Sequence, residues 1–198
     1  MIYLYSGTPG SGKSMHATKD ILDYMKRGRP VIANYMLNFR EWKKLDRKLF
    51  MYVDNSELTP QYLTQYSIDN LKRGRENQCL VVIDECAIML NCRDFSRKDR
   101  AAWITFFQQH RKLGYNIILV CQFDRMLDRQ IRAFVEYEVI HRKLNNAGGV
   151  GLVLSLLHIT CFYCVERWYG LRMVTNKSFL RVNKKLCKAY NSYIIFSE

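Results

Sequence analysis

The stretch that decides the fold of this 198-residue chain is Gly7-Thr8-Pro9-Gly10-Ser11-Gly12-Lys13-Ser14. It matches the pattern GxxxxGK followed by Ser or Thr, in which a glycine-rich turn presents backbone amides to phosphate oxygens. The context is also right, because residues 2–6 form an apolar run typical of a buried strand and residues 15–25 carry apolar side chains at helical spacing. Strand, glycine-rich turn and helix in this order predict a P-loop, and therefore a nucleotide-binding protein.

The residues of this loop have distinct expected roles. Gly10 and Gly12 let the backbone surround the phosphates, and the following helix adds its partly positive end. Lys13 is expected to reach the β- and γ-phosphates, and Ser14 to place its hydroxyl on Mg²⁺. We therefore expect ATP and Mg²⁺ as cofactors. The expected nucleotide-binding set is Gly7, Thr8, Pro9, Gly10, Ser11, Gly12, Lys13, Ser14 and Met15.

An acidic pair follows a second apolar run. Residues 79–83 are continuously apolar, which is typical of a strand buried on both faces of a parallel sheet, and Asp84 and Glu85 come directly after them. Adjacent carboxylates are costly to bury unless a cation lies nearby. We therefore expect Asp84 to hold Mg²⁺, as a Walker B aspartate does, and Glu85 to polarise the attacking water. A surface acidic pair at a strand end is the alternative.

Further polar residues are candidates for the same chemistry. Gln122 ends the apolar run 116–122, where a polar side chain can sense the γ-phosphate or position water; a turn glutamine is the alternative. Arg111, Arg129 and Arg132 are candidate arginine fingers that act across a subunit interface, because a planar, always charged guanidinium bridges phosphate oxygens. Any of these arginines can equally be a surface residue. The expected catalytic set is Lys13, Glu85, Gln122 and Arg111.

The order of the remaining elements predicts the fold class. Strands at 30–34 and 116–122 alternate with helices at 59–73 and 97–113, which indicates an α/β protein with a mostly parallel sheet flanked by helices. After residue 134 the pattern changes to alternating and aromatic segments, which predict antiparallel strands at the sheet edge. We therefore expect a P-loop ATPase core over residues 1–142 and a β-rich extension of the same domain over residues 143–198.

An apolar stretch and the cysteines raise two other possibilities. Residues 150–165 are shorter than the ~20 residues that a membrane helix needs, and their β-branched and aromatic content favours strands; a tilted helix in a thinned bilayer is the alternative. Cys161 and Cys164 have CxxC spacing but lack a second ligand pair, so we expect buried cysteines rather than a zinc site. The seven scattered cysteines and the lack of a secretory signal favour a reduced, cytosolic compartment.

The chain is strongly basic. Its formal net charge is +13, which predicts attraction to polyanions or to anionic lipid. In the segment from Arg167 to Lys188, basic residues alternate with aromatic ones and acidic residues are absent. This mixture suits binding to a phosphate backbone or to a lipid surface. Solvated strand faces are the alternative.

Taken in order, these motifs resemble a known family. The start MIYLYSGTPGSGKS, the strand CLVVIDE, the block FFQQHRKLGYNIILVCQ and the following DRQIR are similar to the Zot (zonula occludens toxin) domain, which filamentous-phage assembly ATPases share. The pattern HRKxGxxIxLxxQ after the acidic pair carries the resemblance. It covers residues 1–142, and the later segment is consistent with the family but less diagnostic.

The resemblance implies a P-loop ATPase of the additional-strand, FtsK/HerA-like type, in which the strand before Asp84 does not neighbour the strand before the loop. It gives Lys13, Ser14, Asp84 and Glu85 the roles described above. It further implies an ATP-hydrolysing motor for phage assembly that acts as a homo-oligomer, such as a hexamer. The expected partners are phage assembly and coat proteins, exported single-stranded DNA and the host membrane. The expected location is the cytoplasmic face of the host bacterial inner membrane, with this chain itself a soluble cytoplasmic domain.

The chain also departs from the family pattern. Family members usually carry a transmembrane helix after the ATPase domain, whereas this sequence stops at Glu198. Either it is the cytoplasmic domain of a longer protein, or membrane attachment comes from partners or from residues 150–165; the family's toxin activity is not transferred. Two other functions stay open. Nucleotide or small-molecule kinases use a similar loop, although no glycine-flanked, arginine-rich lid is evident, and a non-hydrolysing, nucleotide-gated membrane adaptor is the third class.

Overall fold

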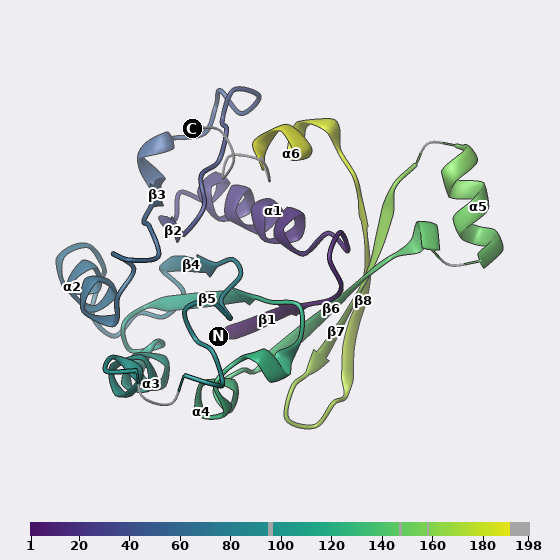
Figure 1. The fold of residues 1–198 in the computed structure, drawn as a ribbon. Coiled ribbons are helices and arrows are strands. Elements are labelled where there is room, and N and C mark those ends of the chain that lie inside the picture. Colours follow the sequence, from purple (N-terminus) through teal and green to yellow (C-terminus); the bar gives the residue numbers. More distant parts are fainter. Residues whose placement is uncertain (95–96, 147, 158, 191–198) are drawn as a thin grey trace.

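The computed structural model describes residues 1–94, 97–146, 148–157 and 159–190 (Figure 1). Its strands are β1 (Ile2–Ser6), β2 (Val31–Ala33), β3 (Phe50–Tyr52), β4 (Cys79–Ile83), β5 (Tyr115–Val120), β6 (Tyr137–Lys143), β7 (Cys161–Trp168) and β8 (Val174–Arg181). Its α-helices are α1 (Lys13–Lys26), α2 (Pro60–Asn70), α3 (Arg100–Gln109), α4 (Arg129–Arg132), α5 (Gly148–Leu156) and α6 (Lys184–Ala189). Single turns of 3₁₀ helix lie at Arg47–Leu49, Asp124–Met126 and Leu144–Asn146.

The strands of the described residues form one eight-stranded sheet in the order β3-β2-β4-β5-β1-β6-β7-β8. Neighbouring strands from β3 to β6 are parallel, whereas β6, β7 and β8 pair antiparallel. β5 lies between β1 and β4, so the predicted additional-strand arrangement is confirmed. Because β1, β4 and β5 are parallel, their carboxyl ends meet at one edge of the sheet, which is where ligands bind in open α/β sheets.

Helices cover both faces of the parallel part of the sheet (Figure 1). On one face α1 buries Ile21 and Leu22 against apolar side chains of the strands, and α6 adds Leu186 to the same cluster. On the other face α3 contributes Trp103 and Phe107 to a second cluster, which also contains side chains of α2 and α4. The predicted helices at 59–73 and 97–113 are therefore confirmed, with later starts and earlier ends.

The apolar stretch 150–165 does not have the structure that its composition predicts. Its first part belongs to α5 and only its second part belongs to a strand, β7. The strand pairing explains the difference: the paired part of β6 and β7 ends at Lys143 and Phe162, so the chain beyond it has no neighbouring strand, and a helix satisfies its backbone internally. Figure 1 shows α5 standing away from the sheet. Among the residues that the structure describes, no helix is both long and apolar enough to cross a membrane.

Candidate functional site

The carboxyl ends of β1, β4 and β5 border a cavity of about 560 Å³. The loop after β1 lines one part of it, Asp84 and Glu85 line another, and Gln122 follows the strand between them. The structure therefore brings together the loop, the acidic pair and Gln122. The lining residues are Pro9, Gly10, Gly12, Lys13, Ser14, Met15, Asp84, Glu85, Ala87, Ile88, Asn91, Val120, Cys121, Gln122, Met126, Phe162 and Tyr190. Gly7, Thr8 and Ser11 belong to the same loop and are not among these lining residues.

The loop owes its path to glycine. Gly10 has φ 71° and Gly12 has φ 90°, values in the left-handed region that other L-residues adopt only at a cost. The Lys13 ammonium donates hydrogen bonds to the carbonyl oxygens of Gly7 at 2.8 Å and Thr8 at 3.1 Å. Burial lowers the pKa of Lys13 from its ordinary value, while the nearby carboxylate of Asp84 acts in the opposite direction. The lysine is thus held across the loop with its charge directed to the acidic pair.

Gly12 is also constrained from the side of β7. A Cβ atom at this position would lie 2.7 Å from the Cδ2 atom of Phe162 and 2.8 Å from its Cγ atom. Phe162 is 6% exposed, so its ring packs directly on the start of α1. The C-terminal strands therefore form part of the loop's support, a role that the β-rich composition of that segment does not reveal.

Asp84 is held from several directions. Its backbone N–H donates to Asn34 Oδ1 at 2.7 Å, and Asn34 Nδ2 donates to its carbonyl oxygen at 2.8 Å. Burial raises the pKa of the Asp84 carboxyl, although hydrogen bonds from Ser14, the Glu85 amide and Tyr190 each act to lower it. The Tyr190 hydroxyl lies 3.4 Å from Asp84 Oδ2. A buried carboxylate with a raised pKa beside a hydroxyl is an electrostatic setting that a cation would relieve.

Glu85 and Gln122 complete the group. Glu85 is exposed and has φ 48°, a left-handed conformation that costs a non-glycine residue about 1–2 kcal/mol. Its amide donates to Asp84 Oδ1 at 3.0 Å, so the turn at Glu85 helps to hold the Asp84 carboxylate. The carbonyl oxygen of Gln122 accepts a hydrogen bond from the Gly7 amide at 3.2 Å, which ties the end of β5 to the loop.

These residues fit ATP and Mg²⁺. A side chain built at Gly10 would meet no other atom within 4 Å, so the loop is open there. The Ser11 hydroxyl is buried and has no hydrogen-bond partner among the described residues, and Ser14 and Asp84 offer the hydroxyl and carboxylate oxygens that Mg²⁺ prefers. The arrangement can bind a polyphosphate and place a divalent cation against it.

The candidate arginines lie elsewhere. Arg111 follows α3 and precedes β5, at the amino end of the strands, and its side chain pairs with Glu136. Glu136 also lies 3.8 Å from the terminal ammonium of Met1 and 3.8 Å from His110 Nε2. The structure therefore does not bring Arg111 to the loop of its own chain. Arg129 and Arg132 lie on α4, where Arg132 donates to the carbonyl oxygen of Asp124 at 3.3 Å.

Three residues that hold Asp84 or the loop in place lie outside the predicted set: Asn34, Phe162 and Tyr190. The sequence could have indicated Asn34, because it is a polar residue directly after the apolar run of β2. No sequence pattern could have indicated Phe162 and Tyr190, since their position beside the loop depends on how β7 and α6 pack against the rest of the chain.

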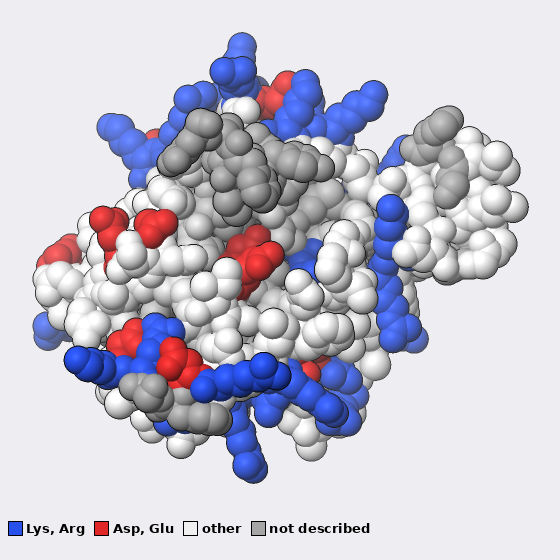
Figure 2. All heavy atoms as spheres, viewed as in Figure 1, with Lys and Arg blue, Asp and Glu red and all other residues white. Residues whose placement is uncertain are grey.

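Basic side chains are spread over the surface rather than gathered at the cavity. Figure 2 shows Lys and Arg in separate groups over this face, with an uncharged knob where α5 stands out. The basic residues of β8, such as Lys177 and Arg181, are exposed. On the face shown, the basic atoms do not join into one continuous groove.

Fold and site together define the class of protein: a P-loop NTPase of the additional-strand type. The family model described as "Zonular occludens toxin (Zot)" matches residues 1–195, and the chain belongs to this family. The resemblance predicted from the motifs is thereby confirmed.

Sequence relatives support the same placement. The chain is 29% identical over 164 residues to the Gene 1 protein of Enterobacteria phage I2-2, covering 79% of this chain and 44% of that protein. It is 27% identical over 164 residues to the Gene 1 protein of Enterobacteria phage M13, covering 79% of this chain and 47% of that protein. The chain thus spans less than half the length of these curated relatives.

Solved structures share the fold. The N-terminal domain of zonular occludens toxin from Neisseria meningitidis superposes with a TM-score of 0.57 at 18% identity, covering 96% of this chain and 98% of that one. The genome packaging NTPase B204 of Sulfolobus turreted icosahedral virus 2, in complex with ATP-gammaS, superposes with a TM-score of 0.56 at 12% identity over 88% of this chain and 95% of that one. The predicted fold class is therefore confirmed.

Proposed function

We propose that this chain is the ATP-hydrolysing motor domain of a phage-assembly machine that exports single-stranded DNA at the host membrane. One observation carries the proposal: the glycine loop, Asp84 and Glu85 border the same cavity. Membership of the Zot family and the likeness to Gene 1 proteins of phages support the assembly role. A genome packaging NTPase has a similar fold, and this likeness supports a role for the present chain in moving nucleic acid.

The residues divide the chemistry between them. The loop amides and Lys13 bind and orient the β- and γ-phosphates. Ser14 and Asp84 would hold Mg²⁺, which when bound neutralises the charge that develops on the phosphate oxygens. Glu85, which lines the cavity, would orient and polarise the attacking water, and Gln122, which lines the same cavity, would sense the γ-phosphate.

A homo-oligomer is part of the proposal. Because Arg111 is 50% exposed and lies at the amino end of the strands, it can act only on the loop of a neighbouring subunit. Arg129 and Arg132 remain candidates for the same task. Mixing subunits that lack a candidate arginine with subunits that carry Lys13→Ala tests this: turnover that reappears in the mixture supports action in trans, and turnover that stays absent argues against that arginine.

Membrane association is proposed to run through α5. Leu152 is 64% exposed, Leu156 is 71% exposed and the adjoining Leu157 is 62% exposed, whereas Arg142 and Lys143 lie exposed just before the helix. Exposed apolar side chains that follow exposed basic ones along the chain suit the acyl layer and the anionic headgroups of a bilayer. This arm would hold the motor at the cytoplasmic face of the host inner membrane, beside coat and assembly proteins.

The test measures ATP turnover and ATP binding by the full chain with anionic vesicles, single-stranded DNA and coat protein present. Lys13→Ala should abolish turnover, because the loop loses its phosphate-binding charge, and Lys19→Ala on the outer face of the same helix should not. Turnover that is absent in the wild type under all these conditions would overturn the proposal. Phosphoryl transfer to a nucleotide faster than to water would indicate a kinase, and tight binding without hydrolysis in the oligomer would indicate an adaptor.

A further inference from the structure

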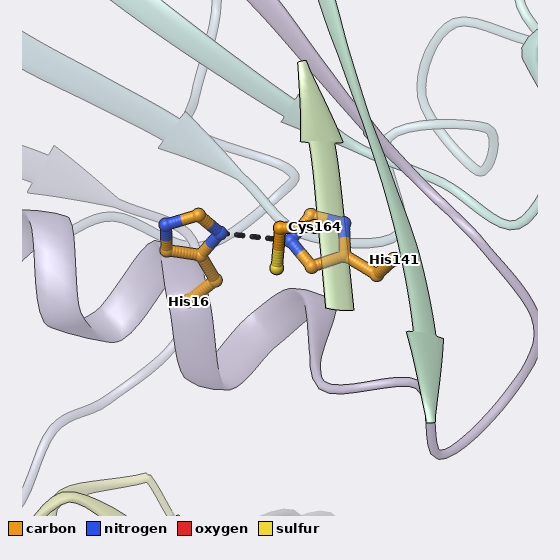
Figure 3. Close-up of side chains that lie close together, drawn as sticks. All are labelled: His16, His141 and Cys164. Atoms are coloured by element: carbon orange, nitrogen blue, oxygen red, sulfur yellow. Dashed lines mark hydrogen bonds between the residues drawn. The ribbon is translucent and has the colours of Figure 1, made fainter. Parts of the chain in front are cut away.

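Three metal-binding side chains meet behind the nucleotide loop, from three different elements (Figure 3). His16 lies in the first turns of α1, His141 in β6 and Cys164 in β7. One ring nitrogen of each histidine and the cysteine sulfur all lie within 4.8 Å of one another. His141 and Cys164 are each 1% exposed. None of the proposed steps of ATP hydrolysis uses them.

Strand pairing and the position of α1 bring these three residues together. His141 and Cys164 are directly opposite in the antiparallel register of β6 and β7, so their side chains project from the same face of the sheet. That face is the one α1 covers, and α1 begins at the loop, so His16 is set above the pair. Cys161 is three residues before Cys164 in the same strand, and alternate residues point to opposite faces. Cys161 and Cys164 therefore point to opposite faces of β7, and of the two expected buried cysteines only Cys164 is buried, whereas Cys161 is half-buried.

One nitrogen of each ring faces the cluster. His141 Nδ1 lies 3.2 Å from the carbonyl oxygen of Ser6; because a carbonyl only accepts, Nδ1 carries the hydrogen and Nε2 presents its lone pair to the cluster. His16 Nδ1 lies 2.8 Å from that Nε2 atom and therefore donates its hydrogen to it in the metal-free chain; metal binding would move this hydrogen to the other nitrogen of His16. The other nitrogen of His16 lies 4.0 Å from the carboxylate of Asp20, which is itself held by the Tyr5 hydroxyl. Carbonyl and carboxylate partners on the outer ring nitrogen are typical of histidines that bind metal.

The size and chemistry of the cluster fit zinc. Zn²⁺ bonds of about 2.0–2.1 Å to nitrogen and about 2.3 Å to sulfur place neighbouring ligand atoms of a tetrahedral site roughly 3.3–3.7 Å apart. The two facing nitrogens, 2.8 Å apart, must open by about half an ångström to meet that distance, and the separations of up to 4.8 Å within the cluster must close as the ion draws the ligands together. His16 also lines a cavity of about 380 Å³ beneath α1, which offers an entry route and room for water as a fourth ligand. Ligand sets that consist of nitrogen and sulfur atoms without carboxylates favour zinc over Mg²⁺.

We propose that His16, His141 and Cys164 form a binding site for a zinc-type cation, completed by water from the adjacent cavity. The ion would fasten the first turns of α1 to β6 and β7. It would therefore brace the nucleotide loop from the side away from the phosphates, because His141 contacts the Ser6 carbonyl oxygen and its backbone runs so close to Gly7 that a Cβ there would lie 2.5 Å from the His141 carbonyl oxygen. The site is independent of ATP turnover and can be tested without nucleotide.

The experiment titrates the metal-stripped, reduced full chain with Co²⁺ and with Zn²⁺. One equivalent of Co²⁺ should bind and give the near-ultraviolet charge-transfer band of a cobalt–thiolate bond, and Zn²⁺ should displace it and raise the melting temperature. Cys164→Ala should remove the band and weaken binding at least about tenfold, a loss that even changes in outer ligands cause. Cys161→Ala is the matched control in the same strand and should behave as wild type.

His16→Ala provides a second variant on a partly exposed helix face, in case the buried cysteine variant does not fold. It should weaken zinc binding and remove the zinc-dependent rise in melting temperature, each measured against the metal-stripped form of the same variant. Wild-type protein that binds neither metal, or a thiolate band that survives Cys164→Ala or disappears with Cys161→Ala, would overturn the proposal. Unchanged zinc affinity in His16→Ala would do the same.

Discussion

The packing of Phe162 on Gly12 leads to a prediction whose size follows from the structure. In Gly12→Ala the new methyl group would lie 2.7 to 2.9 Å from three atoms of the Phe162 ring, and overpacking of this kind costs about 1–3 kcal/mol. The φ of 90° at this position adds about 1–2 kcal/mol for an L-residue. The free energy of unfolding should therefore fall by about 2–5 kcal/mol. A fall of about 3 kcal/mol would lower the melting temperature by about 6–12 °C in a chain of this size.

A double-mutant cycle separates the two contributions. Urea unfolding without nucleotide would be measured for the wild type, Gly12→Ala, Phe162→Ala and the double variant. Without the ring only the backbone cost of about 1–2 kcal/mol remains, so the alanine at position 12 should cost about 1–3 kcal/mol less in the Phe162→Ala background. Equal losses in both backgrounds would show that the ring does not constrain the loop, and would refute the reasoning.

Three other outcomes are expected. Glu85→Gln should lower ATP turnover by about 10²- to 10⁴-fold while ATP binding persists, as loss of a general base does; equal turnover would remove Glu85 from the mechanism. Replacing Leu152 and Leu156 by Glu should reduce sedimentation with anionic vesicles, and unchanged sedimentation would exclude the α5 arm as the membrane contact. Burial opposes the charge of Asp128, but hydrogen bonds from Arg100 and from amides of α4 hold its pKa below its usual range. The ionised Asp128 carboxylate therefore adds to the free energy of unfolding at neutral pH, and this contribution is lost as the pH falls through the lowered pKa. Asp128→Asn should therefore cost roughly 1–3 kcal/mol at pH 7 and less in acid, and a cost that does not shrink in acid would contradict this.

The core of the fold could be predicted because its signals are local. Each parallel strand is a short apolar run that ends in a turn or a polar residue, and the loop from Gly7 to Ser14 allows few other conformations. The strand order came from the family resemblance, since apolar runs alone do not say that β5 separates β1 from β4. The error over residues 150–165 arose because a short apolar run suits a strand or a helix equally well. The absence of a pairing partner beyond Lys143 decided between them, and pairing is not visible in the sequence.

The functional site likewise contains residues that the sequence predicts and residues that it does not predict. Lys13, Ser14, Asp84 and Glu85 follow directly from motifs, and the structure places them around one cavity. Phe162 and the His16 cluster depend on contacts between segments more than 100 residues apart along the chain. No local pattern announces such contacts. Cys164 illustrates the point, because its CxxC spacing from Cys161 gives no sign of its contact with His16 and His141.

The position of β1 in the sheet also bears on how the chain folds. Ile2 is paired with Ile117 of β5, and Tyr3 is paired with Tyr137 of β6. β1 therefore leaves the ribosome well before both of its neighbours in the sheet, and the closure of such long loops slows folding. Nucleotide cannot assist the early steps, since its loop is not held in shape until β5 and β6 have joined β1. During synthesis the residues that bind phosphate are made well before the strands that hold their loop in place.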